Sequence, residues 1–194
     1  TLYKEIGRFA KYELMGEFNL GPSFEGKIKV PAFKTLLKEK GLILYSFLIE
    51  PHDLLEVSYV ARRDRPRERN YQRIIKGDRL EAIKEFITKE GGFFANNILI
   101  ALWGKKEDIR FKNIKGSCTS MSLDEWPYLV EFGILEFPKR YRSCWIIDGQ
   151  HRLYSFSKIK ELKTLMPVIA LQNDNLENYD YITQQCKLFI DINK

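Results

Sequence analysis

The segment from Cys144 to Ser155 holds the residue types that could do chemistry, in an order that suits phosphate binding. Cys144 to Ile147 is apolar and predicts a buried strand, Asp148-Gly149 is a turn dipeptide, and Gln150 to Lys160 predicts a helix. The first turn of a helix presents unpaired backbone N–H groups and the positive end of the helix dipole, which both attract anions. A strand, a glycine turn and a helix that opens with His and Arg together predict an anion site.

Each residue of this turn has a role in such a site and an ordinary structural alternative. Gly149 allows close backbone approach because it has no Cβ. Arg152 could make a bidentate charged contact, and His151 could donate a second hydrogen bond or carry a proton. In the alternative, Asp148 only caps the helix, and His151 and Arg152 face solvent. The residues alone leave both interpretations open.

Asp148 to Arg152 reads Asp-Gly-Gln-His-Arg, and on this motif the chain resembles the DGQHR-domain family. That family includes the Dnd-type DNA phosphorothioation regulator and related proteins of DNA-modification and phage-defence systems. Tyr71 to Arg73, Gly91 to Ile98 and Phe189 to Lys194 also resemble family landmarks, in the family's order. The resemblance therefore covers about Leu42 to the end. More distantly, the motif is similar to the Gly-x-x-Arg phosphate motif of the ParB and sulfiredoxin-like superfamily, whose members bind nucleotide triphosphates there.

The resemblance implies a ParB-like fold and a site for ATP or another NTP, with Mg²⁺ as a second candidate cofactor. An ion between Asp148 and phosphate is the alternative to a structural cap by that carboxylate. His151 and Gln150 are the candidate catalytic residues, because they could position a water or a phosphate oxygen. Gln150 stands where sulfiredoxin-like enzymes place a reactive Cys, and a carboxamide cannot replace a thiol nucleophile. The predicted nucleotide-phosphate-binding residues are Asp148, Gly149, Gln150, His151, Arg152, Gln72, Arg73 and Asn193.

Composition is that of a folded protein with a moderate positive charge. Of the 194 residues, 44% are hydrophobic and 13% aromatic, and the formal net charge is +6. This excess suits a nucleotide or nucleic acid but is common among other proteins. The three cysteines have no C-x-x-C spacing, so the sequence indicates neither a zinc site nor a disulfide framework. With no apolar stretch of membrane-spanning length and no signal peptide, we expect a cytoplasmic protein without a membrane partner.

Helical and strand patterns alternate along the chain, which favours an α+β (mixed α/β) fold with a single sheet flanked by helices. The predicted strands are Lys27–Val30, Leu42–Ile49, Asn97–Leu102, Leu129–Phe137 with an interruption at Gly133 and an end at Pro138, Cys144–Ile147, and Met166–Leu171. The predicted helices are Pro51 to about Ala61, Asp78 to a stop at Gly91-Gly92, Gln150–Lys160, and Glu177–Ile190. The polar segment Gly104–Met121 predicts a loop.

The resemblance also suggests how the chain is organised. Residues 1–41 form an N-terminal extension that is hard to assign, and residues 42–194 form the DGQHR, ParB-like domain. The sequence ends at Lys194, where the family's sequences normally continue. We therefore expect this domain to be truncated at its C-terminal end.

An arginine-rich segment supports a second interpretation. Residues 62–73 hold six arginines against only Asp64 and Glu68, and Pro66 predicts a loop rather than a continuous helix. Arginine clusters attract phosphate backbones, although a solvated loop has the same composition. The predicted DNA-binding residues are Arg62, Arg63, Arg65, Arg67 and Arg69.

Two functional hypotheses follow. The first is a nucleotide-binding, ATP-hydrolysing accessory or regulatory protein of a DNA-modification or phage-defence system, with its phosphates at the DGQHR turn and other proteins of that system as partners. Catalysis is the weaker part of this hypothesis, because the sequence offers no unambiguous general base. The alternative is a non-catalytic DNA-binding transcriptional regulator of a DNA-modification operon, which uses the basic loop.

Overall fold

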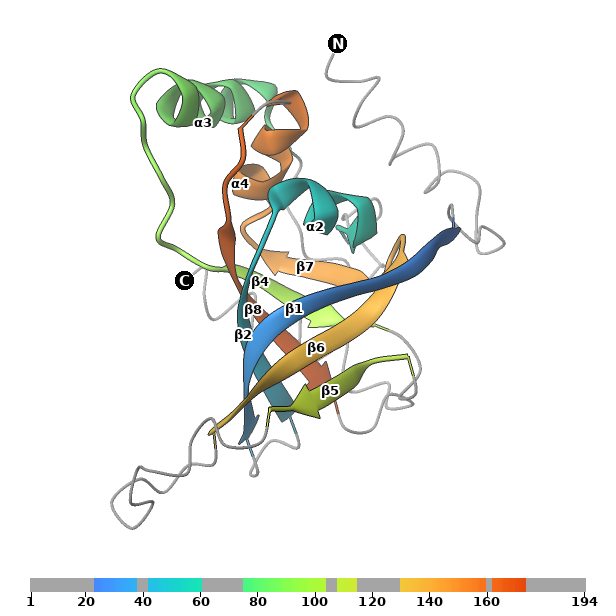
Figure 1. The fold of residues 1–194 in the computed structure, drawn as a ribbon. Helices are drawn as coiled ribbons and strands as arrows, with labels where there is room; N and C mark the ends of the chain where they lie inside the picture. Colours follow the sequence, from blue (N-terminus) through green and yellow to red (C-terminus); the bar gives the residue numbers. More distant parts are fainter. Residues whose placement is uncertain are drawn as a thin grey trace, which may run out of the picture.

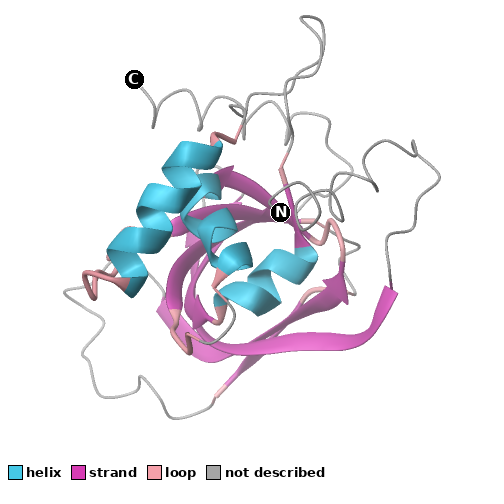
Figure 2. Ribbon diagram, turned by 90° about the horizontal axis from the view of Figure 1, so that it is seen from above, coloured by secondary structure: helices cyan, strands magenta, loops and turns pink. Residues whose placement is uncertain are grey.

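A computed structural model describes residues 23–37, 42–60, 75–103, 108–114, 130–159 and 162–173. These residues form one eight-stranded sheet, three α-helices and a short 3₁₀ helix (Figure 1). The sheet curls on itself, and the helices gather over one of its ends (Figures 1 and 2). The predicted α+β class with a single sheet is confirmed, and the sheet is the larger part of the described structure.

The strand order across the sheet is β3-β7-β4-β8-β2-β1-β6-β5. Neighbours are antiparallel except in the pairs β3–β7 and β4–β8, which are parallel. The strands are β1 (Ser23–Leu37), β2 (Leu42–Ile49), β3 (Ser58–Tyr59), β4 (Ile98–Leu102), β5 (Arg110–Asn113), β6 (Val130–Arg140), β7 (Cys144–Asp148) and β8 (Met166–Asn173).

The inner face of the curled sheet carries the main hydrophobic core. Alternate residues of each strand point inward, as the period of two in a pleated strand requires. The buried inward residues include Ile28, Val30 and Ala32 of β1, Tyr45, Phe47 and Ile49 of β2, Ile98, Ile100 and Leu102 of β4, Leu135 and Phe137 of β6, Cys144 and Ile146 of β7, and Val168 and Ala170 of β8. A smaller cluster around Ala101, Ile147 and Leu171 lies on the opposite face of the sheet.

The helices cover one end of this core. They are α2 (Pro51–Val57), α3 (Gly77–Thr88), α4 (Gln150–Ser155) and the 3₁₀ helix η3 (Phe156–Lys158). Pro51 lies in the first turn of α2, where its missing N–H costs nothing, as predicted. Gly91 follows α3 with a φ of 65°, and the Gly92 N–H donates to the Phe86 carbonyl at 3.0 Å. The predicted glycine stop of α3 is therefore confirmed.

Three strand predictions need correction. β1 runs for 15 residues rather than four, and within the predicted N-terminal extension it pairs with both β2 and β6. Gly133 does not interrupt β6; it lets β5 approach, because a Cβ there would lie 2.3 Å from the Lys112 carbonyl oxygen. Strand β6 also continues past Pro138. Because β5 pairs with β6 only as far as Glu136, no residue of β5 needs a hydrogen bond from an N–H at position 138.

Other boundaries also shift. β5 forms inside the predicted loop at 104–121, where it pairs with β6. α2 ends at Val57 because the chain turns into β3, and the predicted helix after Gly149 tightens to a 3₁₀ turn from Phe156. The predicted helix Glu177–Ile190 lies outside the described residues. None of the helices that the structure describes is long and apolar enough to cross a membrane.

Candidate functional site

The predicted strand, glycine turn and helix are present as β7, Gly149 and α4. Gly149 has a φ of 91°, in the left-handed region that L side chains rarely adopt. A Cβ at this position would lie 2.6 Å from Ile98 Cδ1 and 3.3 Å from Ile98 Cα, at the start of β4. The turn thus requires glycine twice, for its backbone angle and for its contact with the neighbouring strand.

Asp148 does not cap α4, which corrects one sequence interpretation. Gly149 is the N-cap residue, and no side chain of the described residues hydrogen-bonds to the helix start as a cap. Asp148 is the last residue of β7, and its Oδ2 atom lies 3.3 Å from Arg152 Nη2. The left-handed glycine separates Asp148 from the first helical turn, so the carboxylate pairs with the arginine four residues later instead.

Arg152 connects the helix to the chain segment that leads into β4. Its Nη1 donates to the Asn96 carbonyl at 2.6 Å, and its side chain is only 16% exposed. Within the described part of the chain, two of its about five guanidinium N–H donors are therefore used. Burial lowers the pKa of Arg152, the negative charge of Asp148 opposes that shift, and the positive charge of Arg79 adds to it. The alternative in which Arg152 is merely solvated is wrong.

The start of α3 lies against α4, and the positive charge of Arg79 disfavours the charged form of Arg152. The backbone N–H of Lys76, the N-cap residue of α3, donates to His151 Nε2 at 3.4 Å. A ring nitrogen that accepts a hydrogen bond carries no proton, so the proton of a neutral His151 is on Nδ1. Arg79 is exposed in the first turn of α3. Sequence reasoning missed Arg79 because nothing in its local pattern distinguishes it from an ordinary surface cation.

The two candidate catalytic residues differ in exposure. Gln150 is buried at 5% exposure, whereas His151 is half-buried beside the start of α3. The geometry therefore brings together Asp148, Gly149, His151 and Arg152, adds Arg79, and turns Gln150 toward the interior. The other predicted site residues, Gln72, Arg73, Asn193, Arg62, Arg63, Arg65, Arg67 and Arg69, lie outside the described residues.

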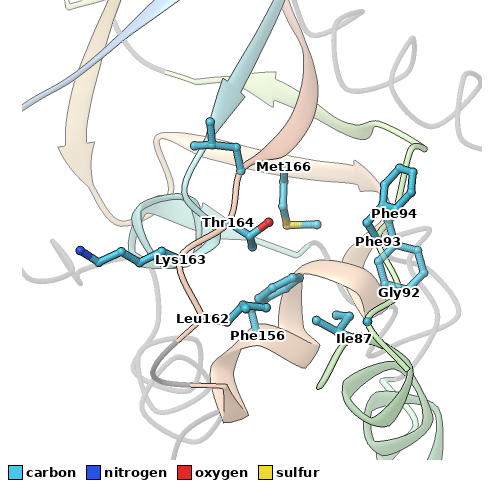
Figure 3. Close-up of a pocket in the computed structure, with 11 residues that line it drawn as sticks. Ile87, Gly92, Phe93, Phe94, Phe156, Leu162, Lys163, Thr164 and Met166 are labelled. Carbon is cyan, nitrogen blue, oxygen red and sulfur yellow. The ribbon is translucent and has the colours of Figure 1, made fainter. Parts of the chain in front are cut away.

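A pocket of about 240 Å³, lined mainly by apolar residues, lies where the end of α3, η3 and the chain that enters β8 meet (Figure 3). Its lining comes from the end of α3, the segment Gly91–Phe94, η3, and the chain that enters β8. Phe156 and Met166 face the cavity from opposite sides, and Lys163 extends away from it. Phe156 is one helical turn after Arg152, and Phe94 is two residues before Asn96, whose carbonyl Arg152 contacts. The pocket and the arginine are thus neighbours along two chain segments.

Comparisons with protein-family models, with curated proteins and with solved structures found no match to this chain. Membership of the DGQHR-domain family and a ParB-like fold therefore stay predictions.

Proposed function

We propose that this protein binds a nucleotide triphosphate such as ATP, with the phosphates at Arg152 and the base in the adjoining pocket. The observation that supports this proposal is the mostly buried guanidinium of Arg152, which is fixed by the Asn96 carbonyl and Asp148 at the turn where α4 begins. Repulsion from Arg79 and the partial burial of Arg152 both oppose the charged form of Arg152. A bound phosphate would offset both effects, because its negative charge attracts both guanidinium groups.

The donors that remain at this place suit phosphate oxygens. Arg152 is held in one orientation by Asn96 and Asp148, so little side-chain entropy is lost when its other N–H groups meet a ligand. Arg79 is exposed and can turn toward the same ligand. α3 contributes the positive end of a 12-residue helix.

The pocket suits the apolar part of a nucleotide. Ligand pockets combine an apolar lining with a few polar groups at one side, and here the charged side is the Arg152 turn. Phe94 and Phe156 both line the cavity and could pack against a base. We infer that a nucleotide would lie along α4, with its base near Phe156 and its phosphates near Arg152.

ATP hydrolysis is the second part of the proposal. His151 would position the attacking water after exchanging the long Lys76 N–H contact for that water. A magnesium ion would neutralise part of the phosphate charge. Asp148, whose carboxylate pairs with Arg152, could contact that ion. Buried Gln150 supports the turn from the inside in this arrangement.

The biological setting comes from the resemblance alone. We infer a DGQHR-domain protein with a ParB-like fold that acts in a DNA-modification or phage-defence system. The alternative, a non-catalytic DNA-binding regulator, depends on the arginines at 62–69, for which the structure gives no geometry. DNA binding through those residues would weaken steeply with added salt.

Calorimetric titrations with ATP, CTP and GTP, each with and without Mg²⁺, test the proposed function. Arg79→Ala should weaken ATP binding about tenfold, the loss of one charge-assisted contact. Because Arg79 is exposed, this variant should unfold at the temperature of the wild type. Lys27→Ala, which removes an exposed cation from β1, is the matched control and should bind normally. Unchanged ATP affinity in both Arg79→Ala and Arg152→Lys would refute the site.

A further inference from the structure

An aromatic cluster lies on the outer face of the sheet, at the edge formed by β3, β7 and β4. Tyr59 is paired with Trp145 in register, and their ring centroids are 5.1 Å apart. Trp103, directly after β4, stacks on Trp145 with centroids 4.7 Å apart and planes 20° apart. Cys144 and Ile146 point to the main core, so Trp145 between them points to the opposite face. All three rings are half-buried, and part of each is open to solvent.

Arg142 extends this cluster from the turn between β6 and β7. Its guanidinium carbon lies 4.4 Å from the centre of the Tyr59 ring and 5.8 Å from that of Tyr141. The turn is closed by the Ser143 N–H, which donates to the Arg140 carbonyl at 3.1 Å. Tyr59 therefore contacts both an arginine and a tryptophan.

Among the described residues, no carboxylate balances the positive charge of Arg142. Within that part of the chain, its guanidinium takes part in no ion pair and no hydrogen bond, and its Nε atom is buried. By contrast, Arg152, Lys139 and Lys158 each contact an acidic side chain. The cation–π contact places the group over the Tyr59 ring and leaves its charge available to an anion.

The backbone conformation of Arg142 also indicates that this residue does not stabilise the fold. Its φ of 70° is the one positive value of a non-glycine residue among the described residues. Glycine is the favoured residue in that conformation, and a cation–π contact at a half-exposed site offsets the strain only in part. An arginine at this position is explained better by a ligand than by the fold.

We propose that this surface binds single-stranded nucleic acid, with Arg142 on a phosphate and exposed bases against Tyr59 and Trp145. Aromatic rings beside an uncompensated guanidinium are the combination that non-specific single-strand binding uses. A single strand is favoured because its bases can leave their own stack to meet a side-chain ring, whereas duplex bases cannot. The net charge of +6 assists an anionic partner. This surface lies at the opposite end of β7 from Gly149 and does not depend on the proposed nucleotide site.

Fluorescence anisotropy of a labelled oligothymidylate of about 12 nucleotides, within the usual range of site sizes, tests the proposal. The wild type should bind it, with an affinity that falls as salt is added. Arg142→Gly should weaken binding at least about tenfold, the range expected for losing a stacked, charged contact. Because glycine relieves the left-handed strain, the melting temperature of this variant should stay near that of the wild type.

Controls separate this site from general charge and from the nucleotide site. Arg140→Ala removes an exposed cation two residues away and should change affinity less than about twofold. Arg142→Gln removes the positive charge but keeps the aliphatic part of the side chain as far as Cγ, and serves as the second variant if Arg142→Gly misfolds. Excess ATP should not displace the oligonucleotide.

Three results would overturn the proposal. They are wild-type affinity in a folded Arg142 variant, preference for a duplex of equal length, and displacement of the oligonucleotide by ATP.

Discussion

Two residues with left-handed backbone mark the two ends of β7. Gly149 adopts that conformation without penalty, and its missing side chain is where Ile98 packs. Arg142 adopts it at a cost and places a charged group on an aromatic ring. A glycine where the fold needs one indicates packing, whereas an arginine where the fold would favour glycine points to binding.

Substitution of Gly149 should be among the most destabilising single changes in the turn. Gly149→Ala forces an alanine into a left-handed φ that it rarely adopts, and it adds a Cβ only 2.6 Å from Ile98 Cδ1. We therefore expect a loss of about 3 kcal/mol in the free energy of unfolding. Gly91→Ala is the matched control, since Gly91 also has positive φ but no atom within 4 Å of the place that the new methyl group would take. It should cost about 1 kcal/mol in urea denaturation. Equal losses in the two variants would contradict the packing role.

Cys144 should be inert in the folded protein. Burial raises the pKa of its thiol to about 12, and the side chain is fully buried on the inner face of β7. Only the thiolate reacts with alkylating agents, so iodoacetamide at mildly alkaline pH should leave the Cys144 peptide unmodified. Mass spectrometry of native and urea-unfolded samples checks this. Rapid native labelling of Cys144 would mean that β7 opens readily.

At the scale of elements, α3 and η3 are connected by charges on their exposed sides. Glu81 of α3 lies 2.7 Å from Lys158 Nζ of η3 and 2.8 Å from Lys84 Nζ of its own helix. These contacts hold α3 beside the α4–η3 segment, which carries both Arg152 and Phe156. The position of Arg79 relative to Arg152 therefore depends partly on an ion pair made two residues further along α3.

This ion pair gives a pH-dependent contribution to stability. Hydrogen bonds from Lys158 and Lys84 lower the pKa of Glu81 to about 2. A carboxyl whose folded pKa lies below its unfolded value near 4.5 stabilises the fold above that value and loses the effect as the pH falls toward 2. The melting temperature of Glu81→Gln should therefore be below that of the wild type at neutral pH. The difference should shrink between about pH 4.5 and 2, and a constant difference over that range would contradict the assignment.

Strong local patterns predicted most elements correctly, and tertiary pairing explains the exceptions. β2, α3, β4 and β8 have clear periodicity, and their predicted bounds lie within a few residues of the observed ones. β5 reads as a polar loop because it is a short edge strand whose four residues are mostly exposed. Gly133 and Pro138 looked like strand breakers because their tolerance depends on which neighbour pairs with β6, and a single strand does not contain that information.

The part of the candidate site that is formed by adjacent residues was predictable from the sequence, whereas the parts that combine distant segments were not. Asp148 to Arg152 form one continuous turn, so the strand, the glycine turn and the helix follow from adjacent residues, whereas the burial of Arg152 does not. Arg79, the pocket and the Arg142 surface each combine segments distant in sequence. Their residues give no local signal, because a surface arginine and a core phenylalanine look the same in sequence whether or not they line a site.

On the scale of the whole molecule, the curled sheet separates two candidate surfaces. The helices lie over one end of the sheet (Figures 1 and 2) and carry Arg152 and Arg79. The outer face of the β3-β7-β4 edge carries Tyr59, Trp145 and Arg142. β7 connects them, with one surface at each end. A protein built this way could hold a nucleotide and a nucleic acid strand at once, which fits the proposed role in DNA modification.

The most direct test of the nucleotide site is a two-dimensional ¹H–¹⁵N spectrum during titration with ATP. The backbone amide of Gly149 and the Nε–H of Arg152 should shift together and saturate, because both adjoin the proposed phosphate position. The Trp145 indole signal, at the other end of β7, should not move. Saturable binding with stationary Gly149 and Arg152 signals would contradict the account, and so would the absence of any shift at millimolar ATP.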